Sequence, residues 1–92
     1  MDERIKEILT EKLKECLNKN GQVPEPINSL VQKFAYAHPA HSVPIRNGII
    51  VGRLYNSFFY QCRRILKRNP SDDEFTEFID FIKDSNVLRE DY

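Results

Sequence analysis

The sequence predicts an all-α fold, a small four-helix bundle-like single domain over residues 1–92 with a long third helix. Three observations lead to this prediction. The chain of 92 residues has the length of one domain with one core. Apolar residues recur at helical spacing in four segments. Proline, glycine or asparagine residues separate these segments, and such residues are typical of helix ends.

The first predicted helix covers residues 3–18. One of its faces is apolar, and lysine and glutamate residues fill the opposite face. The apolar positions are Ile5, Ile8, Leu9, Leu13, Cys16 and Leu17. Asn18, Asn20 and Gly21 predict the end of the helix, because asparagine and glycine tolerate the left-handed conformation that follows a last helical turn.

The second predicted helix covers residues 26–38. Pro26 is suited to its first position, where a backbone N–H has no helical partner. Pro39 disfavours a helical conformation at His38, so the helix is expected to end there. The expected apolar face consists of Ile27, Leu30, Val31, Phe34 and Ala37.

Residues 38–48 leave two structures open. The first is an ordered loop. The second is a short β-hairpin at 43–51 that turns at Asn47 and Gly48, and it gives the alternative fold class, α+β. The loop is favoured, because Pro44 weakens the first strand and so short a hairpin has little stability of its own.

The third predicted helix is the longest. It runs from Ile49 or Gly52 to Arg68, and Asn69 and Pro70 end it. At ~100° per residue its apolar positions span an arc of about 140°, which is typical of the central helix of a small bundle. These positions are Val51, Leu54, Tyr55, Phe58, Phe59, Cys62, Ile65 and Leu66.

The fourth predicted helix starts with a capping box, in which Ser71 is the cap and Glu74 its partner three residues later. Its inward-facing residues are expected to be Phe75, Phe78, Ile79 and Ile82. The chain after Asn86 is expected to fold back and place Val87 and Leu88 on the bundle. Five phenylalanines are expected to share one core, namely Phe34, Phe58, Phe59, Phe75 and Phe78.

Charged residues are strongly segregated along the chain, although the formal net charge is zero. Residues 1–25 hold six acidic and five basic residues. Residues 26–71 hold seven basic residues and no acidic one, whereas residues 72–92 hold eight acidic and two basic residues. The neutral total is therefore a cancellation between two neighbouring segments of opposite charge.

The basic residues of the third helix fall on the arc opposite its apolar face, together with polar residues and one tyrosine. The candidate binding residues are Arg53, Tyr60, Arg63, Arg64, Lys67 and Arg68. Arginine binds phosphate through paired hydrogen bonds, and a tyrosine ring can stack on a base. The pattern predicts a nucleic-acid-binding face, and an accessory or regulatory role for a small non-catalytic protein.

Two other interpretations of the charge pattern stay open. A basic and an acidic helix can simply be neighbours, with solvated faces and exposed ion pairs of about 0–1 kcal/mol each. The basic face can also bind an acidic protein, or the acidic fourth helix of a second copy of this chain. The protein would then be an interaction or self-assembly module. A standard helix-turn-helix is disfavoured, because about ten residues separate the second and third helices where three or four are typical.

The sequence predicts no enzyme activity, no cofactor, no metal site and no small-molecule substrate. His38 and His41, with Cys16 and Cys62, lack a compact zinc-ligand spacing, and both cysteines lie on apolar faces where buried thiols are ordinary. The pattern contains neither a signal peptide nor an apolar run of membrane-spanning length. A cytoplasmic protein is therefore expected.

Overall fold

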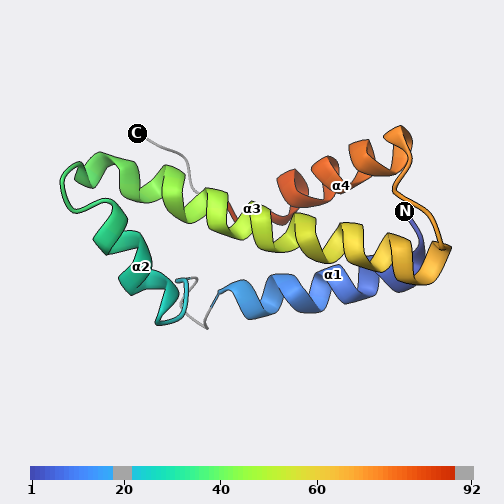
Figure 1. Ribbon diagram of the computed structural model, residues 1–92, viewed down its shortest axis with the longest axis horizontal. Coiled ribbons are helices and arrows are strands. Elements are labelled where there is room, and N and C mark those ends of the chain that lie inside the picture. The colour runs from blue at the N-terminus through green and yellow to red at the C-terminus, as the bar shows by residue number, and fades with distance from the viewer. Residues whose placement is uncertain (18–21, 89–92) are drawn as a thin grey trace.

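The computed structural model describes residues 1–17 and 22–88, which form four α-helices and no strand (Figure 1). The helices are α1 (Glu3–Cys16), α2 (Ile27–Phe34), α3 (Ser42–Gln61) and α4 (Asp72–Ser85). The predicted all-α class is confirmed, and the α+β alternative is wrong. Within these described ranges no helix combines the length and apolar character that crossing a bilayer requires.

Helix α3 is the central element and runs along the long axis of a molecule that measures 43 × 24 × 20 Å (Figure 1). Helix α1 packs along its C-terminal half, and the shorter α2 packs near its N-terminal end. Helix α4 covers another side of the C-terminal half through phenylalanine contacts. The core consists of Ile5, Leu9, Cys16, Val23, Ile50, Leu54, Phe58, Cys62, Phe78, Ile82 and Val87. Helices α1, α3 and α4 therefore share this core, and α2 lies at its edge.

Helix α1 begins at a carboxylate cap. Asp2 Oδ1 accepts the backbone N–H groups of Arg4 and Ile5 at 2.8 and 3.4 Å, so it satisfies two donors of the first turn. The helix ends at Cys16, because Leu17 is extended. The predicted terminating residues Asn18, Asn20 and Gly21 lie outside the described residues.

Helix α2 is shorter than predicted. Pro26 precedes its first residue, and the carboxylate of Glu25 accepts the backbone N–H of Ser29 at 3.2 Å in place of a cap. The helix ends at Phe34 rather than at His38, because residues 35–37 form a turn in which the His38 N–H bonds to the Ala35 carbonyl at 2.9 Å.

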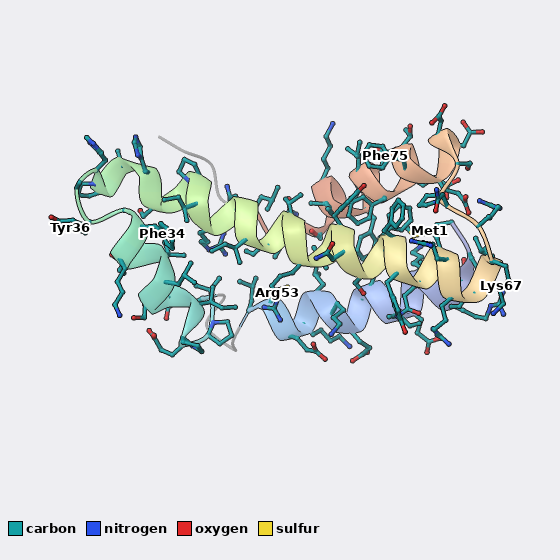
Figure 2. The ribbon with its side chains drawn as sticks, viewed as in Figure 1. Met1, Phe34, Tyr36, Arg53, Lys67 and Phe75 are labelled. Carbon is teal, nitrogen blue, oxygen red and sulfur yellow. The ribbon has the colours of Figure 1, made fainter. Side chains whose placement is uncertain are left out.

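The core position predicted for Phe34 is wrong. The side chain of Phe34 is 72% exposed, and that of Tyr36 is 84% exposed. Figure 2 shows both at the end of the molecule that lies away from α1. Within α2, Val31 is buried and Ile27 packs partly buried against the core, whereas Leu30 and Phe34 are exposed.

Residues 38–51 form neither the predicted loop nor the hairpin. A 3₁₀ turn, η1 (Pro39–His41), leads directly into α3, which starts at Ser42 instead of Ile49 or Gly52. Pro44 is accommodated because it lies in the first turn of α3, where a backbone N–H has no helical partner. Burial of Ile50 in the core favours helix here over the turn propensity of the Asn-Gly pair.

The C-terminal end of α3 widens into a π-helical turn, η2 (Cys62–Leu66). Lys67 then adopts a left-handed conformation with φ of 60°, so the helical segment ends before the predicted Arg68. The capping box of α4 is confirmed, because Ser71 Oγ accepts the Glu74 N–H at 3.2 Å and Glu74 Oε1 accepts the Ser71 N–H at 2.9 Å.

The segment after α4 folds back as predicted. Val87 is buried in the core, and Leu88 packs against it. Arg46, one of the seven basic residues of the middle segment, is itself buried, with 5% of its surface exposed. Its Nη1 donates to the Val87 carbonyl at 3.3 Å and to Asn47 Oδ1 at 3.0 Å. Arg46 therefore joins the tail to α3.

The aromatic residues divide between the core and its border. The rings of Phe58 and Phe78 stack with their centroids 4.5 Å apart, as the core prediction expects. Phe59 is half-buried and Phe75 is partly exposed, so these two lie at the edge of the core and not inside it. Phe81, which lies off the main apolar stripes, packs partly buried against the core.

Candidate functional site

The six candidate residues are all exposed, but they do not form one compact cluster. Arg53 and Tyr60 belong to α3, Arg63 and Arg64 belong to η2, and the last two follow η2. Figure 2 shows Arg53 on the side of α3 that faces α1, and Lys67 at the far end of the helical segment.

Arg68 is engaged in the start of the next helix. Its Nη1 donates to Glu74 Oε1 at 2.5 Å and to the carbonyl of Asn69 at 3.1 Å. The Arg68 guanidinium, assisted by the backbone N–H of Ser71, lowers the pKa of Glu74 to about 2. The charge of Arg68 is therefore balanced by a carboxylate, unlike those of the other candidates.

An open groove lies beside the exposed edge of α3 and η2, and we call it the aromatic groove. It is lined by Tyr55, Asn56, Phe59, Tyr60, Arg63 and Arg64. Tyr55 is 39% exposed, and its ring makes edge contacts with Phe75 and Phe78 of α4, so an aromatic surface continues from α3 onto α4. The groove thus joins ring faces to two guanidinium groups.

The π-helical turn carries both arginines of this groove. A π-turn advances each residue by a smaller angle than an α-turn, and such turns occur frequently at functional sites. Arg64 Nε donates to the Oε1 of Gln61 at 2.8 Å, which orients its guanidinium. A helical wheel drawn from the sequence assumes the constant angle of a regular α-helix, so it cannot include this change of angle.

A second open groove lies between α1 and α3, and we call it the α1–α3 groove. It is lined by Lys12, Cys16, Arg53, Asn56, Ser57, Tyr60 and Gln61. Lys12 comes from α1 and was not a sequence candidate, because no pattern along the chain places it beside Arg53. Its ammonium group also pairs with Glu15 at 3.3 Å, and both side chains are about half exposed.

Sequence reasoning also missed Tyr55 and Phe59. Both lie on the predicted apolar stripe of the third helix, where they were assigned to the core. Both lie at the border of the face that α3 buries through Ile50, Leu54 and Phe58. A border residue is buried or exposed according to how far a neighbouring helix extends over it. The tyrosine hydroxyl was the available signal, since a phenol favours a site with access to water.

Acidic side chains gather on a different surface. An open groove between α1 and α4 includes Glu3 of α1 and Glu77, Asp80 and Asp84 of α4 among its lining residues, with Lys6 as its basic side chain. Among the described residues, Arg53, Arg63, Arg64 and Lys67 form no ion pair with a carboxylate. The segregation of charge along the sequence is therefore also a segregation between surfaces.

The histidines and cysteines do not come together. His38 and His41 lie at η1 with ring centroids 5.0 Å apart, whereas Cys16 and Cys62 are buried in the core as free thiols. Burial raises the pKa of both thiols above the ordinary value. No group of three or more potential metal ligands occurs in the part of the chain that the structure describes.

Neither a protein-family model, nor a curated protein sequence, nor a solved structure matches this chain. Its function is therefore inferred from the side chains and grooves described above.

Proposed function

We propose that this protein is a small non-catalytic nucleic-acid-binding protein, an accessory or regulatory module that binds through the exposed face of α3 and η2. One observation carries the proposal. Four basic side chains on this face, those of Arg53, Arg63, Arg64 and Lys67, are exposed and have no carboxylate partner among the described residues. Three of the four, the arginines, line two open grooves that also hold exposed tyrosine rings.

The chemistry of this face suits a polyanion that carries flat rings. Guanidinium groups donate paired hydrogen bonds to phosphate oxygens, and they hold this geometry better than lysine does. Tyrosine faces provide a platform for a base. The acidic groove on the other surface supports specificity, because it limits loose attachment to any polyanion.

A fluorescence-anisotropy titration at low and at physiological salt tests the proposal. The probes are single-stranded and double-stranded DNA and RNA oligonucleotides. Affinity is expected to fall steeply with salt, because each phosphate contact contributes about 0.7–0.9 to the log–log slope. The variant with Arg63→Gln, Arg64→Gln and Lys67→Gln is expected to lower this slope by about 2.

A matched variant separates local binding from overall charge. Lys6→Gln, Lys14→Gln and Lys33→Gln remove three exposed positive charges from α1 and α2, and they are expected to leave the slope nearly unchanged. Equal losses in the two triple variants would contradict a localised site. Absence of binding to all four nucleic acids at low salt would overturn the proposal.

A second candidate function is binding to an acidic protein partner or to a second copy of this chain. The acidic groove between α1 and α4 favours it, since its charge is opposite to that of the α3 face. Size-exclusion chromatography with light scattering at two salt concentrations tests self-assembly. A dimer that dissociates at high salt supports pairing between acidic and basic faces. A monomer at both salt concentrations contradicts self-assembly.

Two further features support a binding role in the cytoplasm. The raised pKa values and burial of Cys16 and Cys62 disfavour the thiolate that a cysteine nucleophile requires. Both are free thiols, and free thiols are usual in a reducing compartment.

A further inference from the structure

Two residues belong to both grooves on the α3 face. Asn56 and Tyr60 line the aromatic groove and the α1–α3 groove, so they form a ridge that separates them. The side chain of Tyr60 is 61% exposed, which leaves its ring accessible. A ligand long enough to occupy both grooves must therefore pass over this ridge, where Tyr60 offers an exposed ring.

Basic side chains stand on either side of this ridge. Arg63 and Arg64 line the aromatic groove, and Arg53 lines the α1–α3 groove. Among residues 1–17 and 22–88, no acidic residue lines either groove. From Arg53 to Arg63 the chain rises about 15 Å along the helix axis, if the π-turn is treated as ordinary helix. Lys12 adds a second cation beside Arg53, although its pairing with Glu15 makes it the weaker anchor.

One of the two helices that flank the basic face is acidic. Helix α1 packs along this half of α3 and has no net charge, because its four acidic residues are matched by four basic ones. Helix α4 lies on the other side and exposes Asp72 and Asp73 in its first turn. A duplex whose second backbone lay on the α4 side would meet these carboxylates, and like charges repel.

We infer that this face binds a single strand, which crosses the Tyr60 ridge with a base stacked on the phenol and phosphates on Arg63, Arg64 and Arg53. The inference rests on the proposed nucleic-acid binding and specifies its ligand. A duplex hides the faces of its bases within the stack, whereas a single strand offers them to an aromatic side chain. DNA and RNA single strands share this chemistry.

Anisotropy titrations with four labelled probes test the inference. They are single-stranded DNA and RNA of about ten nucleotides, a duplex of the same sequence, and an abasic sugar-phosphate oligomer of equal length. Because stacking contributes to the affinity, the duplex and the abasic oligomer are expected to bind roughly 5- to 100-fold more weakly than the tighter single strand. The comparison of DNA with RNA identifies the preferred sugar.

Tyrosine variants test the ridge itself. Tyr60→Ala is expected to weaken single-strand binding roughly 5- to 100-fold and to leave abasic binding unchanged, whereas Tyr60→Phe keeps most of the affinity. Tyr36→Ala is the matched control, because Tyr36 is also exposed but lies on the α2 side of the molecule. If Tyr60→Ala alters the circular dichroism spectrum, Tyr60→Leu replaces it, since leucine is a strong helix former without an aromatic face.

Single arginine variants test whether the strand crosses the ridge. Arg53→Gln and Arg63→Gln are each expected to lower the salt slope by about 0.7, because each variant removes one phosphate contact from a single strand. The two arginines lie on opposite sides of Tyr60, so an effect of both variants indicates that the strand crosses the ridge. Lys33→Gln on α2 is the control and is expected to have no effect. An unchanged slope in Arg53→Gln overturns the crossing path.

The remaining outcomes distinguish this inference from the proposed function. Equal affinity for duplex and single strand, or equal effects of Tyr60→Ala and Tyr36→Ala, overturn the inference while nucleic-acid binding stands. Failure of every probe to bind overturns both.

Discussion

An ion pair between Arg68 and Glu74 joins the last basic residue of segment 26–71 to the first turn of the acidic helix α4. Arg68 Nη1 donates a 2.5 Å hydrogen bond to Glu74 Oε1, and the same oxygen accepts the backbone N–H of Ser71 at 2.9 Å. The ion pair is thus built into the capping box that begins α4. The abrupt change of charge sign at this point of the sequence therefore has a local structural role.

This pair predicts a pH dependence of stability. The folded-state pKa of Glu74 is lowered from 4.5 to about 2, chiefly by Arg68. The stabilisation is therefore complete above the ordinary pKa and is lost as the pH falls towards 2. At neutral pH we expect Glu74→Gln to lower the free energy of unfolding by about 1–2 kcal/mol, less than the full shift implies, because solvent screens the half-exposed Arg68.

Urea denaturation of the unmodified protein and of Glu74→Gln, at neutral pH and near pH 2, measures the difference in their free energies of unfolding. This difference is expected to shrink at the lower pH. Asp73→Asn removes the same charge from the same turn without touching the pair, and we expect it to have a smaller effect. Equal effects of the two variants would show that the helix dipole, and not the ion pair with Arg68, carries the stabilisation.

Two phenylalanines are expected to differ sharply in their contribution to stability. Phe58 is fully buried and stacks on Phe78, so Phe58→Ala is expected to lower the free energy of unfolding by about 3–5 kcal/mol. Phe34 is mostly exposed, so Phe34→Ala is expected to change it by less than about 0.5 kcal/mol. Urea denaturation monitored by circular dichroism compares them, and Phe58→Leu serves where the alanine variant does not fold. A large loss in Phe34→Ala would contradict the exposed position of Phe34.

Arg46 is expected to be structural. Replacing it with methionine keeps much of the side-chain length but removes the donor to the Val87 carbonyl, so we expect a loss of about 1–3 kcal/mol in the free energy of unfolding. Arg53→Met in the same helix is the control, since Arg53 is exposed and its loss is expected to be within about 0.5 kcal/mol. Denaturation curves of the two variants that coincide would refute the structural role.

Alanine at either glycine of α3 is expected to stabilise the protein. Gly48 and Gly52 lie inside the helix, and a Cβ atom at either position meets no other atom within 4 Å. Since glycine has the greater freedom in the unfolded chain, Gly48→Ala and Gly52→Ala are each expected to raise the free energy of unfolding by about 0.5–1 kcal/mol. Thermal melting measures the gain. A fall in melting temperature would contradict the open space beside these two glycines.

The thiols of Cys16 and Cys62 are expected to react slowly in the folded protein. Both are buried, and burial raises their pKa values, so little thiolate is present and reagents reach it only after local opening. Labelling by a disulfide reagent at mildly alkaline pH is expected to be more than roughly tenfold slower than in urea. Rapid labelling of either cysteine without urea would contradict its place in the core.

The features that the sequence determined by itself depend on residues close together along the chain. The Ser71–Glu74 capping box and the inward positions of Phe58 and Phe78 were predicted correctly, since each needs only helical periodicity or a spacing of a few residues. The candidate basic residues are exposed for the same reason, because they lie opposite a strong apolar stripe.

The tertiary structure decided which faces are covered and which residues from different helices meet. Packing extended α3 back to Ser42 through a segment whose local turn signals predict a loop or hairpin, and the short α2 left Phe34 exposed. Arg46 became buried because the tail returns to it, and Lys12 came to lie beside Arg53 because α1 packs along α3. Local propensities amount to tenths of a kcal/mol per residue, whereas burying one large side chain is worth about 1.5–3 kcal/mol, so packing prevails where the two conflict.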